Sequence, residues 1–292
     1  MWKKILRKIG WERRAPLERA IYVVMFVLFS GFAAFYIYLY LWGFMTGFKT
    51  HWDIVNNPFG LPEKWVPYNY VEIFSYLNVN GNNYFQMLFN SLYFSVLGPL
   101  IQLSVTSMFA YACCKYKFPC SRLFYPLILI TMTLPIYGSG GSQYKIIKAL
   151  GLIDSYMHIV LAFCGMSSFF LYFTAIYTGV SNTYYEAAVL DGANEWQAYF
   201  KVMLPQAKNL FLALFLIMWE AEWNNYSGVL LYLPNIPTLA GGVYLCELDM
   251  VYDVRYDMIY AAYMVSAIPP LIIFACFSNV LTNSISLGGI KE

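Results

Sequence analysis

The chain has 292 residues, of which 60% are hydrophobic and 12% are charged, and its mean hydropathy is +0.54. Soluble domains carry about 25% charged residues, so this composition excludes an ordinary soluble protein and indicates a membrane protein. The formal net charge of +2 says little by itself, but the distribution of the charges does. The six cysteines form no CxxC metal pattern and no disulfide framework, so we expect no metal site.

Six stretches of the chain carry few or no charges and approach the length of a membrane-spanning helix. A hydrocarbon core of about 30 Å requires about 20 helical residues. The predicted spans are residues 20–44, 85–112, 123–140, 157–179, 209–232 and 260–282. Isolated strands cannot satisfy their backbone in lipid. The predicted fold is therefore all-α, an integral membrane protein with six transmembrane helices.

The lysines and arginines are distributed unevenly between the two sides that six spans would define. With a cytoplasmic N-terminus, the inner segments hold 13 basic residues and the outer segments hold five. Basic residues favour the cytoplasmic side, so both termini are predicted to be cytoplasmic. Residues 1–19 then form a basic cytoplasmic tail, and residues 20–292 form one membrane domain. The outer loop 45–84 contains several prolines and asparagines and is predicted to be irregular.

The inner loop 180–208 is predicted to contain two short helices. Thr183 followed by Glu186 matches a capping box, which starts a helix through residues 184–190. Gly192 provides a stop, because glycine adopts positive φ without strain. Asn194 with Gln197 suggests a second box, and this second helix is expected to end near Met203, before Pro205.

The first of these helices has an unusual surface for an exposed segment. Residues 187–190 are Ala, Ala, Val and Leu, and small or apolar side chains on an exposed helix indicate a partner surface. Local chemistry alone leaves another interpretation open. The segment could be an amphipathic elbow lying on the membrane, with Glu186 serving only as a cap.

The sequence EAAVLDGANEWQAYFKVMLP (186–205) resembles the EAA loop of binding-protein-dependent ABC importer permeases. That signature contains Glu-Ala-Ala, then a glycine, a branched aliphatic residue and Leu-Pro at fixed spacing, and every position is matched here. The fuller form with Asp191, Ala193 and Phe200 is similar to the carbohydrate branch of the family, as in maltose permeases. The ending SLGGIKE resembles that of a polysaccharide-importing subgroup. Altogether the resemblance covers about residues 85–292.

This resemblance implies a type I importer fold and a division of labour between subunits. Two ABC ATPase subunits bind ATP and Mg²⁺, a second and different permease chain pairs with this one, and an extracytoplasmic solute-binding protein delivers the solute. This chain has no GxxxxGK[ST] segment and needs no cofactor of its own. The residues that would couple to the ATPase are Glu186, Ala187, Ala188, Asp191, Gly192, Ala193, Leu204 and Pro205.

Span 5 contains polar residues near its middle, in the stretch WEAEWNNYS (219–227). A charge at mid-bilayer costs about 2.5–3.5 kcal/mol on insertion scales, so such residues usually face a bundle interior or a wet cavity. Glu220 and Glu222 cannot share a helix face, but Glu220 can share one with Asn224, and Glu222 with Asn225. The predicted substrate-pathway residues are Glu220, Glu222, Trp223, Asn224, Asn225 and Tyr226.

The sequence leaves several alternatives open. A glutamate of span 5 could instead pair with the partner permease or cap a broken helix. Asn225 stands where the family usually has an acidic residue, so family substrates do not transfer well. The predicted function is a permease subunit of an oligosaccharide or polysaccharide-fragment importer in the bacterial cytoplasmic membrane. The rivals are a permease for a peptide or polyol, and a stand-alone membrane receptor or enzyme. Neither histidine has a catalytic context, and no nucleic-acid partner is expected.

Overall fold

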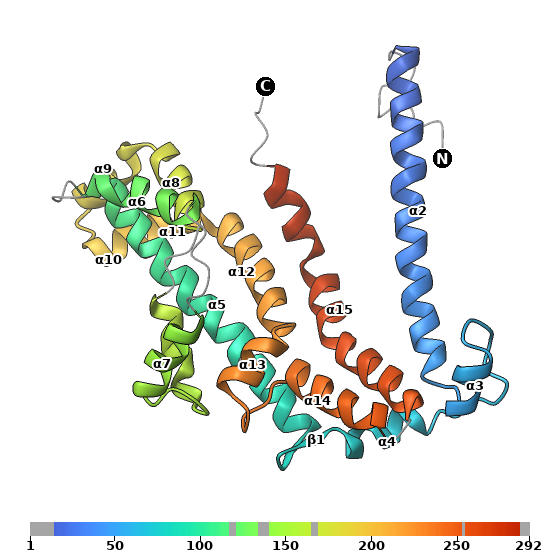
Figure 1. The fold of residues 1–292 in the computed structure, drawn as a ribbon. Coiled ribbons are helices and arrows are strands. Elements are labelled where there is room, and N and C mark those ends of the chain that lie inside the picture. The colour runs from blue at the N-terminus through green and yellow to red at the C-terminus, as the bar shows by residue number, and fades with distance from the viewer. Residues whose placement is uncertain (1–14, 117–120, 134–139, 165–168, 253–254, 287–292) are drawn as a thin grey trace. The chain divides into compact units, whose positions relative to one another are not determined.

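The computed structural model describes residues 15–116, 121–133, 140–164, 169–252 and 255–286. It is mostly helical, as predicted, and forms two compact units (Figure 1). One unit comprises the chain up to Ile73 together with Met250–Met264, and the other comprises Phe74–Asp249 with the chain from Val265. Each unit is described by itself.

The elements that begin the chain are α2 (Pro16–Thr46), α3 (His51–Asn56), α4 (Asn69–Tyr76), β1 (Asn78–Val79), β2 (Asn82–Asn83) and α5 (Tyr84–Lys115). The central elements are α6 (Ser121–Thr133), α7 (Gly140–Ala149), η2 (Tyr156–Cys164), α8 (Phe169–Gly179), α9 (Asn182–Leu190), α10 (Glu195–Ala198), η3 (Tyr199–Met203) and α11 (Leu204–Gln206). The last elements are α12 (Lys208–Trp223), α13 (Tyr226–Tyr232), α14 (Leu239–Tyr252) and α15 (Tyr256–Ser286).

Helix α2 is the most apolar of the long helices, and its most apolar stretch is entirely unburied within this chain. Pro16 stands in its first turn, where the missing N–H costs no hydrogen bond. The side chains exposed along it are almost all aliphatic or aromatic. A helix that is apolar on every side is suited to lipid or to another membrane helix rather than to water.

The outer loop 45–84 is more regular than predicted, because it contains α3, α4 and a small hairpin. The Lys49 side chain is completely buried, and its ammonium group donates to the carbonyls of Asn57 and Pro58. Buried Asn69 donates to the carbonyls of Gly47 and Lys49, at 3.0 and 2.9 Å. The prediction of an irregular loop was wrong because these long-range bonds, which no local pattern reveals, order the backbone.

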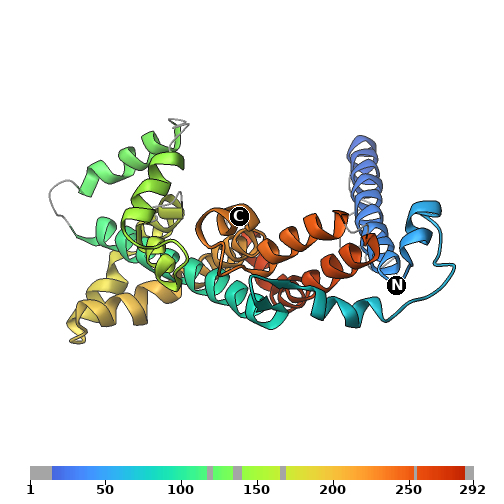
Figure 2. The same ribbon diagram turned by 60° about the horizontal axis from the view of Figure 1, so that its bottom comes forward.

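Helix α5 is the central element of the second unit, where it contacts α8, α12 and η2 (Figures 1 and 2). The hairpin β1–β2 precedes it and turns through Asn80 and Gly81, both at positive φ, as an Asn-Gly hairpin turn requires. Asn83 and Gln86 then form a reciprocal capping box that begins α5. The start of α5 is therefore fixed by local sequence.

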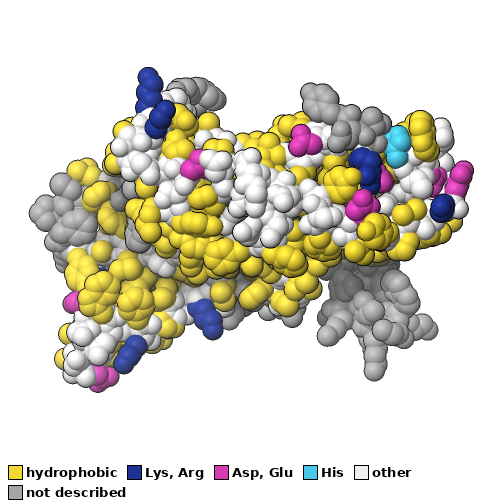
Figure 3. Space-filling model, turned by 90° about the horizontal axis from the view of Figure 1, so that it is seen from below, with side chains coloured by type: hydrophobic (Ala, Val, Ile, Leu, Met, Phe, Trp, Pro, Cys, Tyr) yellow, Lys and Arg dark blue, Asp and Glu magenta, His cyan; other side chains and the backbone are white. Residues whose placement is uncertain are grey.

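Three helices in the described residues are long and apolar enough to cross a membrane, namely α2, α5 and α15. A fourth candidate is the bent pair Glu195–Gln206 and Lys208–Trp223, whose halves differ in direction by 76°. Hydrophobic side chains cover much of the face seen in Figure 3, with charged side chains sparse among them. These helices overlap predicted spans 1, 2, 5 and 6.

The remaining predicted spans differ from single long helices. Span 3 corresponds to α6, which has 13 residues, and residues 134–139 lie outside the described part of the chain. The predicted end of span 3 at residue 140 coincides with the first residue of α7 (Gly140–Ala149). Span 4 is divided into the 3₁₀ helix η2 and α8, with residues 165–168 between them outside the description.

Polar side chains hold the segment after α13, residues 233–239, against the start of α5. Asn80 and Asn82 donate to the carbonyls of Pro234 and Asn235, and Asn90 donates to that of Pro237 at 2.9 Å. Asn90 also accepts a hydrogen bond of 2.7 Å from the Tyr156 hydroxyl. Since Asn90 is 1% exposed, both ends of its amide are satisfied inside the protein.

We predict that Asn90→Leu lowers the stability of the second unit. Leucine has a similar volume but leaves the buried Pro237 carbonyl without its partner, which costs about 1–3 kcal/mol, and it also removes the acceptor of the partly exposed Tyr156 hydroxyl. Each variant is heated in detergent, and the loss of its monodisperse peak in size-exclusion chromatography gives an apparent melting temperature. Phe89→Leu, at a neighbouring side chain that is 60% exposed, is the control. Equal melting temperatures for the two variants would contradict the prediction.

Candidate functional site

The inner loop begins with α9, which contains the EAA residues. The structure starts this helix earlier than predicted, because its N-cap is Ser181, whose hydroxyl accepts from the Thr183 N–H. The predicted Thr183–Glu186 capping box was therefore wrong. Asn182, now the first helical residue, accepts a hydrogen bond of 2.7 Å from the Lys115 ammonium group at the end of α5. This tertiary contact favours the earlier start.

The end of α9 is a Schellman motif centred on Gly192. The Gly192 N–H donates to the Val189 carbonyl at 3.0 Å, and the Ala193 N–H donates to the Ala188 carbonyl at 2.9 Å. Gly192 has φ of 80°, the left-handed conformation that this motif needs and that glycine adopts freely. The prediction of a stop at Gly192 is confirmed.

The second half of the loop begins immediately after this stop. Asn194 and Gln197 form the predicted reciprocal capping box, with bonds of 2.9 and 3.0 Å. The helical chain does not end before Pro205, which corrects the prediction. It widens into the π-helical turn η3 and passes through Pro205 to Gln206. A wider turn relieves the clash between a proline ring and the carbonyl four residues earlier.

The first half of the inner loop, α9, is more exposed than the second half, which runs from α10 to α11. No residue of α9 is buried, and Leu190 is 87% exposed. Among the predicted coupling residues, those that are exposed are Glu186, Ala187, Asp191, Gly192 and Pro205, and those that are half-buried are Ala188, Ala193 and Leu204. The exposed aliphatic and aromatic side chains around them are Tyr184, Val189, Trp196 and Phe200. This surface has the composition of a protein-binding site.

Buried hydroxyl groups join the loop to the helices of the second unit. The Tyr199 hydroxyl, on η3, donates to Ser107 Oγ of α5 at 2.9 Å, and Tyr177 of α8 shares a 2.6 Å hydrogen bond with the same oxygen. All three residues are at most 3% exposed. Met203 and Ala207 lie with them in one hydrophobic cluster. The second half of the loop is therefore part of the core, whereas α9 projects from it.

The polar residues of span 5 lie at a break between α12 and α13, so the predicted continuous helix over 209–232 was wrong. Asn225 causes the break, because its side-chain oxygen accepts from the Gly228 N–H at 2.9 Å and caps α13. Both predicted pairs are present. Asn224 donates to Glu220 at 2.8 Å, and Asn225 donates to Glu222 at 3.3 Å.

The aromatic residues of this region occupy two different positions. Tyr226 is 45% exposed, and its ring stacks on Tyr244 of α14 with centroids 4.8 Å apart. Trp223 is 4% exposed and packs against Trp219 at 5.3 Å, so it lies beneath the polar surface rather than on it. Glu220, Glu222 and Asn224 are exposed within this chain.

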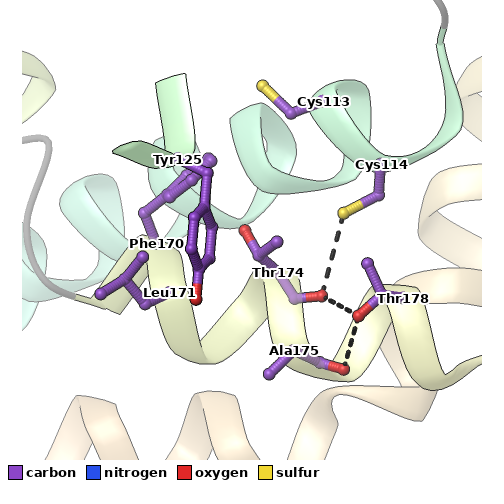
Figure 4. Close-up of a pocket in the computed structure, with 8 residues that line it drawn as sticks. All are labelled: Cys113, Cys114, Tyr125, Phe170, Leu171, Thr174, Ala175 and Thr178. Carbon is purple, nitrogen blue, oxygen red and sulfur yellow. Dashed lines mark hydrogen bonds between the residues drawn. The ribbon is translucent and has the colours of Figure 1, made fainter. Parts of the chain in front are cut away.

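A separate cavity of about 620 Å³ lies among α5, α6 and α8 (Figure 4). Its lining residues are Cys113, Cys114, Tyr125, Phe170, Leu171, Thr174, Ala175 and Thr178. The Cys114 thiol and the Thr178 hydroxyl both point to the Thr174 carbonyl, at 3.8 and 2.8 Å. None of the lining side chains is charged, and the hydroxyl groups of the lining belong to Tyr125, Thr174 and Thr178.

The chain belongs to the family described as binding-protein-dependent transport system inner membrane components, whose model matches residues 104–286. It is thus a multi-pass membrane protein of the permease class, with the fold that the EAA resemblance implied. The match includes both the inner loop and span 5.

Related proteins agree with this assignment. The chain is 28% identical over 256 residues to the diacetylchitobiose uptake system permease protein NgcG of Streptomyces coelicolor, covering 85% of this chain and 82% of that one. It is 27% identical over 218 residues to the arabinooligosaccharides transport system permease protein AraQ of Bacillus subtilis, covering 75% and 78%.

The fold is also that of a solved transporter. A chain in the crystal structure of a bacterial ABC transporter involved in the import of the acidic polysaccharide alginate superposes with a TM-score of 0.74. The match covers 91% of this chain and 98% of that chain, at 22% identity.

We predict that Gly192→Val loosens the end of α9, whereas Gly192→Asn changes it less. A Cβ at this position would meet no atom within 4 Å, so only the backbone conformation matters. A left-handed residue other than glycine costs about 1–2 kcal/mol, and asparagine tolerates it best. Hydrogen exchange of residues 188–194 should be about tenfold faster with valine than in the unsubstituted protein. Equal exchange in all three proteins would contradict the prediction.

Proposed function

We propose that this chain is a transmembrane permease subunit of an ATP-driven importer of oligosaccharides or polysaccharide fragments. It forms part of the solute pathway and couples to an ATPase through the exposed helix α9. The observation that carries the proposal is the capped, unburied α9, which bears the EAA residues in a chain of the permease family.

The inner loop supports a coupling role by its construction. One half, α10 to α11, is anchored in the hydrophobic core, and the other half, α9, is free of burial and ends in an exposed leucine. Force applied to α9 by a partner therefore reaches membrane helices through short, packed connections. ATP binding in that partner would then bias two states of the permease through α9.

The chemistry of ATP belongs to a partner in this proposal. ATP and Mg²⁺ bind to the ABC ATPase subunits, and this chain contributes no catalytic residue. The other proposed partners are a second, different permease subunit and an extracytoplasmic solute-binding protein. The proposed location is the bacterial cytoplasmic membrane, with both termini and α9 on the inner side.

The break in span 5 supports a role in the solute pathway. Exposed carboxylates and amides hydrogen-bond sugar hydroxyls, and tyrosine faces stack on the C–H faces of a ring. Exposed Glu220, Glu222 and Asn224, with half-buried Asn225, supply the first kind of group and Tyr226 supplies the second, while buried Trp223 supports them from below. The names of the related NgcG and AraQ proteins favour an oligosaccharide solute.

We predict that Leu190→Glu releases the ATPase. Purified through a tag on this chain from its native membrane in mild detergent, the unsubstituted protein should bring with it a P-loop ATPase, a second permease and a binding protein. A charge in place of an 87% exposed leucine would oppose burial in the ATPase groove. Mass spectrometry should then find the ATPase reduced about tenfold or more, a loss of at least ~1.4 kcal/mol.

Gln206→Glu, at the exposed end of the anchored half, is the matched control and should keep the ATPase. Recovery of the unsubstituted chain alone after gentle solubilisation would overturn the proposed function. The bound solute of a co-purified binding protein would decide between a sugar, a peptide and a polyol.

We predict that Glu222→Ala lowers uptake of the solute that the binding protein retains, while assembly is unchanged. Loss of a charged hydrogen-bonding group costs about 1.5–3 kcal/mol, which is about a tenfold to hundredfold effect. The measurement is the initial rate of uptake into vesicles. Glu63→Ala removes an exposed carboxylate from the outer loop and serves as the control. Uptake by Glu222→Ala at the unsubstituted rate would remove span 5 from the pathway.

A further inference from the structure

One carboxylate joins three separate elements where the inner loop meets the membrane helices. Glu195, the first residue of α10, accepts the proton of the Tyr185 hydroxyl, whose oxygen lies 3.0 and 3.2 Å from the two carboxylate oxygens. It also accepts a hydrogen bond from the hydroxyl of Tyr116, the residue that caps the C-terminus of α5. Glu195 thus links α9, α10 and the end of α5.

The chemistry of this contact is complementary, because a carboxylate only accepts hydrogen bonds and a protonated phenol can donate one. Burial raises the pKa of Tyr116 and of Tyr185, and hydrogen bonding to Glu195 raises both pKa values further. Both phenols therefore stay protonated at neutral pH. Hydrogen bonds to an ionised acceptor are about twice as strong as neutral ones.

Besides its packing against α10 and η3, α9 is positioned by few side-chain contacts. None of its residues is buried, and its start is held by the Lys115 ammonium group, which donates to Asn182 and to the Val180 carbonyl at 2.7 and 3.3 Å. Tyr185 is the side chain of α9 that packs against the hydrophobic cluster, and its hydroxyl extends to Glu195. Consecutive residues at the end of α5, Lys115 and Tyr116, therefore restrain α9 at two points.

We infer that Glu195 is a positioning residue that transmits movement of α9 to the membrane helices. The inference rests on the proposed function, in which α9 receives the movement from an ATPase. Without Glu195, α9 would connect to α10 mainly through the backbone at Gly192, a residue with little conformational preference. With Glu195, a displacement of Tyr185 is passed through the carboxylate to Tyr116 and hence to α5. Glu195 lies outside the residues that the EAA signature specifies.

The test uses the complex purified through a tag on this chain and placed in lipid nanodiscs. The probe is Mg-ATP with vanadate, which traps the ATPase without any need for the solute. Hydrogen exchange is measured in residues 182–193 and 220–228, with and without trapping, and ATP hydrolysis is measured in parallel. In the unsubstituted complex, trapping should change exchange in both segments.

Glu195→Ala should keep ATP hydrolysis and the response of residues 182–193 but reduce the response of residues 220–228 about threefold to tenfold, as expected for mutation of a coupling residue. Glu195→Gln should restore part of that response, since its amide oxygen can accept from one tyrosine while its NH₂ group cannot. Tyr185→Phe combined with Glu195→Ala should add little to Glu195→Ala alone.

Tyr172→Phe, which removes an exposed hydroxyl from α8, is the matched control and should respond like the unsubstituted complex. A full response of residues 220–228 in Glu195→Ala would overturn the role of Glu195 and leave the proposed function standing. Absence of an ATPase from the unsubstituted preparation would overturn both proposals.

Discussion

The inner loop is tied to the membrane helices by three hydroxyl groups that meet at Ser107. The oxygen of Ser107 on α5 bonds to Tyr177 of α8 and to Tyr199 of η3, and all three side chains are buried in the hydrophobic cluster. Each hydroxyl would be costly to bury alone, so the three groups specify one relative position of their elements. The bend that follows at Ala207 and the direction of α12 both depend on where this contact places η3.

Asparagine side chains have a recurring role in this chain, which is to begin a helix. Asn83, Asn194 and Asn225 each cap a helix with their side-chain oxygen. The cap matters most at Asn225, inside predicted span 5, because in lipid a free backbone N–H costs several kcal/mol unless it is paired within the protein. The same residue type thus permits the outer start of α5, the turn within the inner loop and the break in span 5. Asn225 therefore contributes to the polar surface of span 5 and also caps the helix that follows the break.

Sequence reasoning found two local signals in the inner loop but missed two in the outer loop, the Asn80-Gly81 turn and the Asn83–Gln86 capping box. Two caps were predicted correctly because each is encoded within a few residues. They are the Asn194–Gln197 capping box and the helix stop at Gly192. Sequence reasoning also failed where a distant residue decides the outcome. Asn182 joins α9 because Lys115 holds it, and the outer loop is ordered by Lys49 across eight positions and by Asn69 across 20 and 22 positions.

For span 5 the sequence correctly paired each glutamate with an asparagine, but hydropathy alone could not show that Asn225 also caps α13. For the inner loop, a proline is usually a stop, and only the π-helical turn before Pro205 lets the helix continue. The contacts of Glu195 had no sequence signal, since Tyr116 is 79 positions away in the chain.

Helix α5 is a rod of 32 residues that is fastened at both ends. Asn90 and Ser91 attach its outer end to the segment after α13, and Ser107, Lys115 and Tyr116 attach its inner end to the loop. Pro99 lies buried between these attachments. A proline removes one backbone hydrogen bond, so the rod is least stiff there. A rotation of the inner end of α5 relative to its outer end is therefore expected to bend the helix at Pro99. Such a movement bends one helix and does not slide one helix past another.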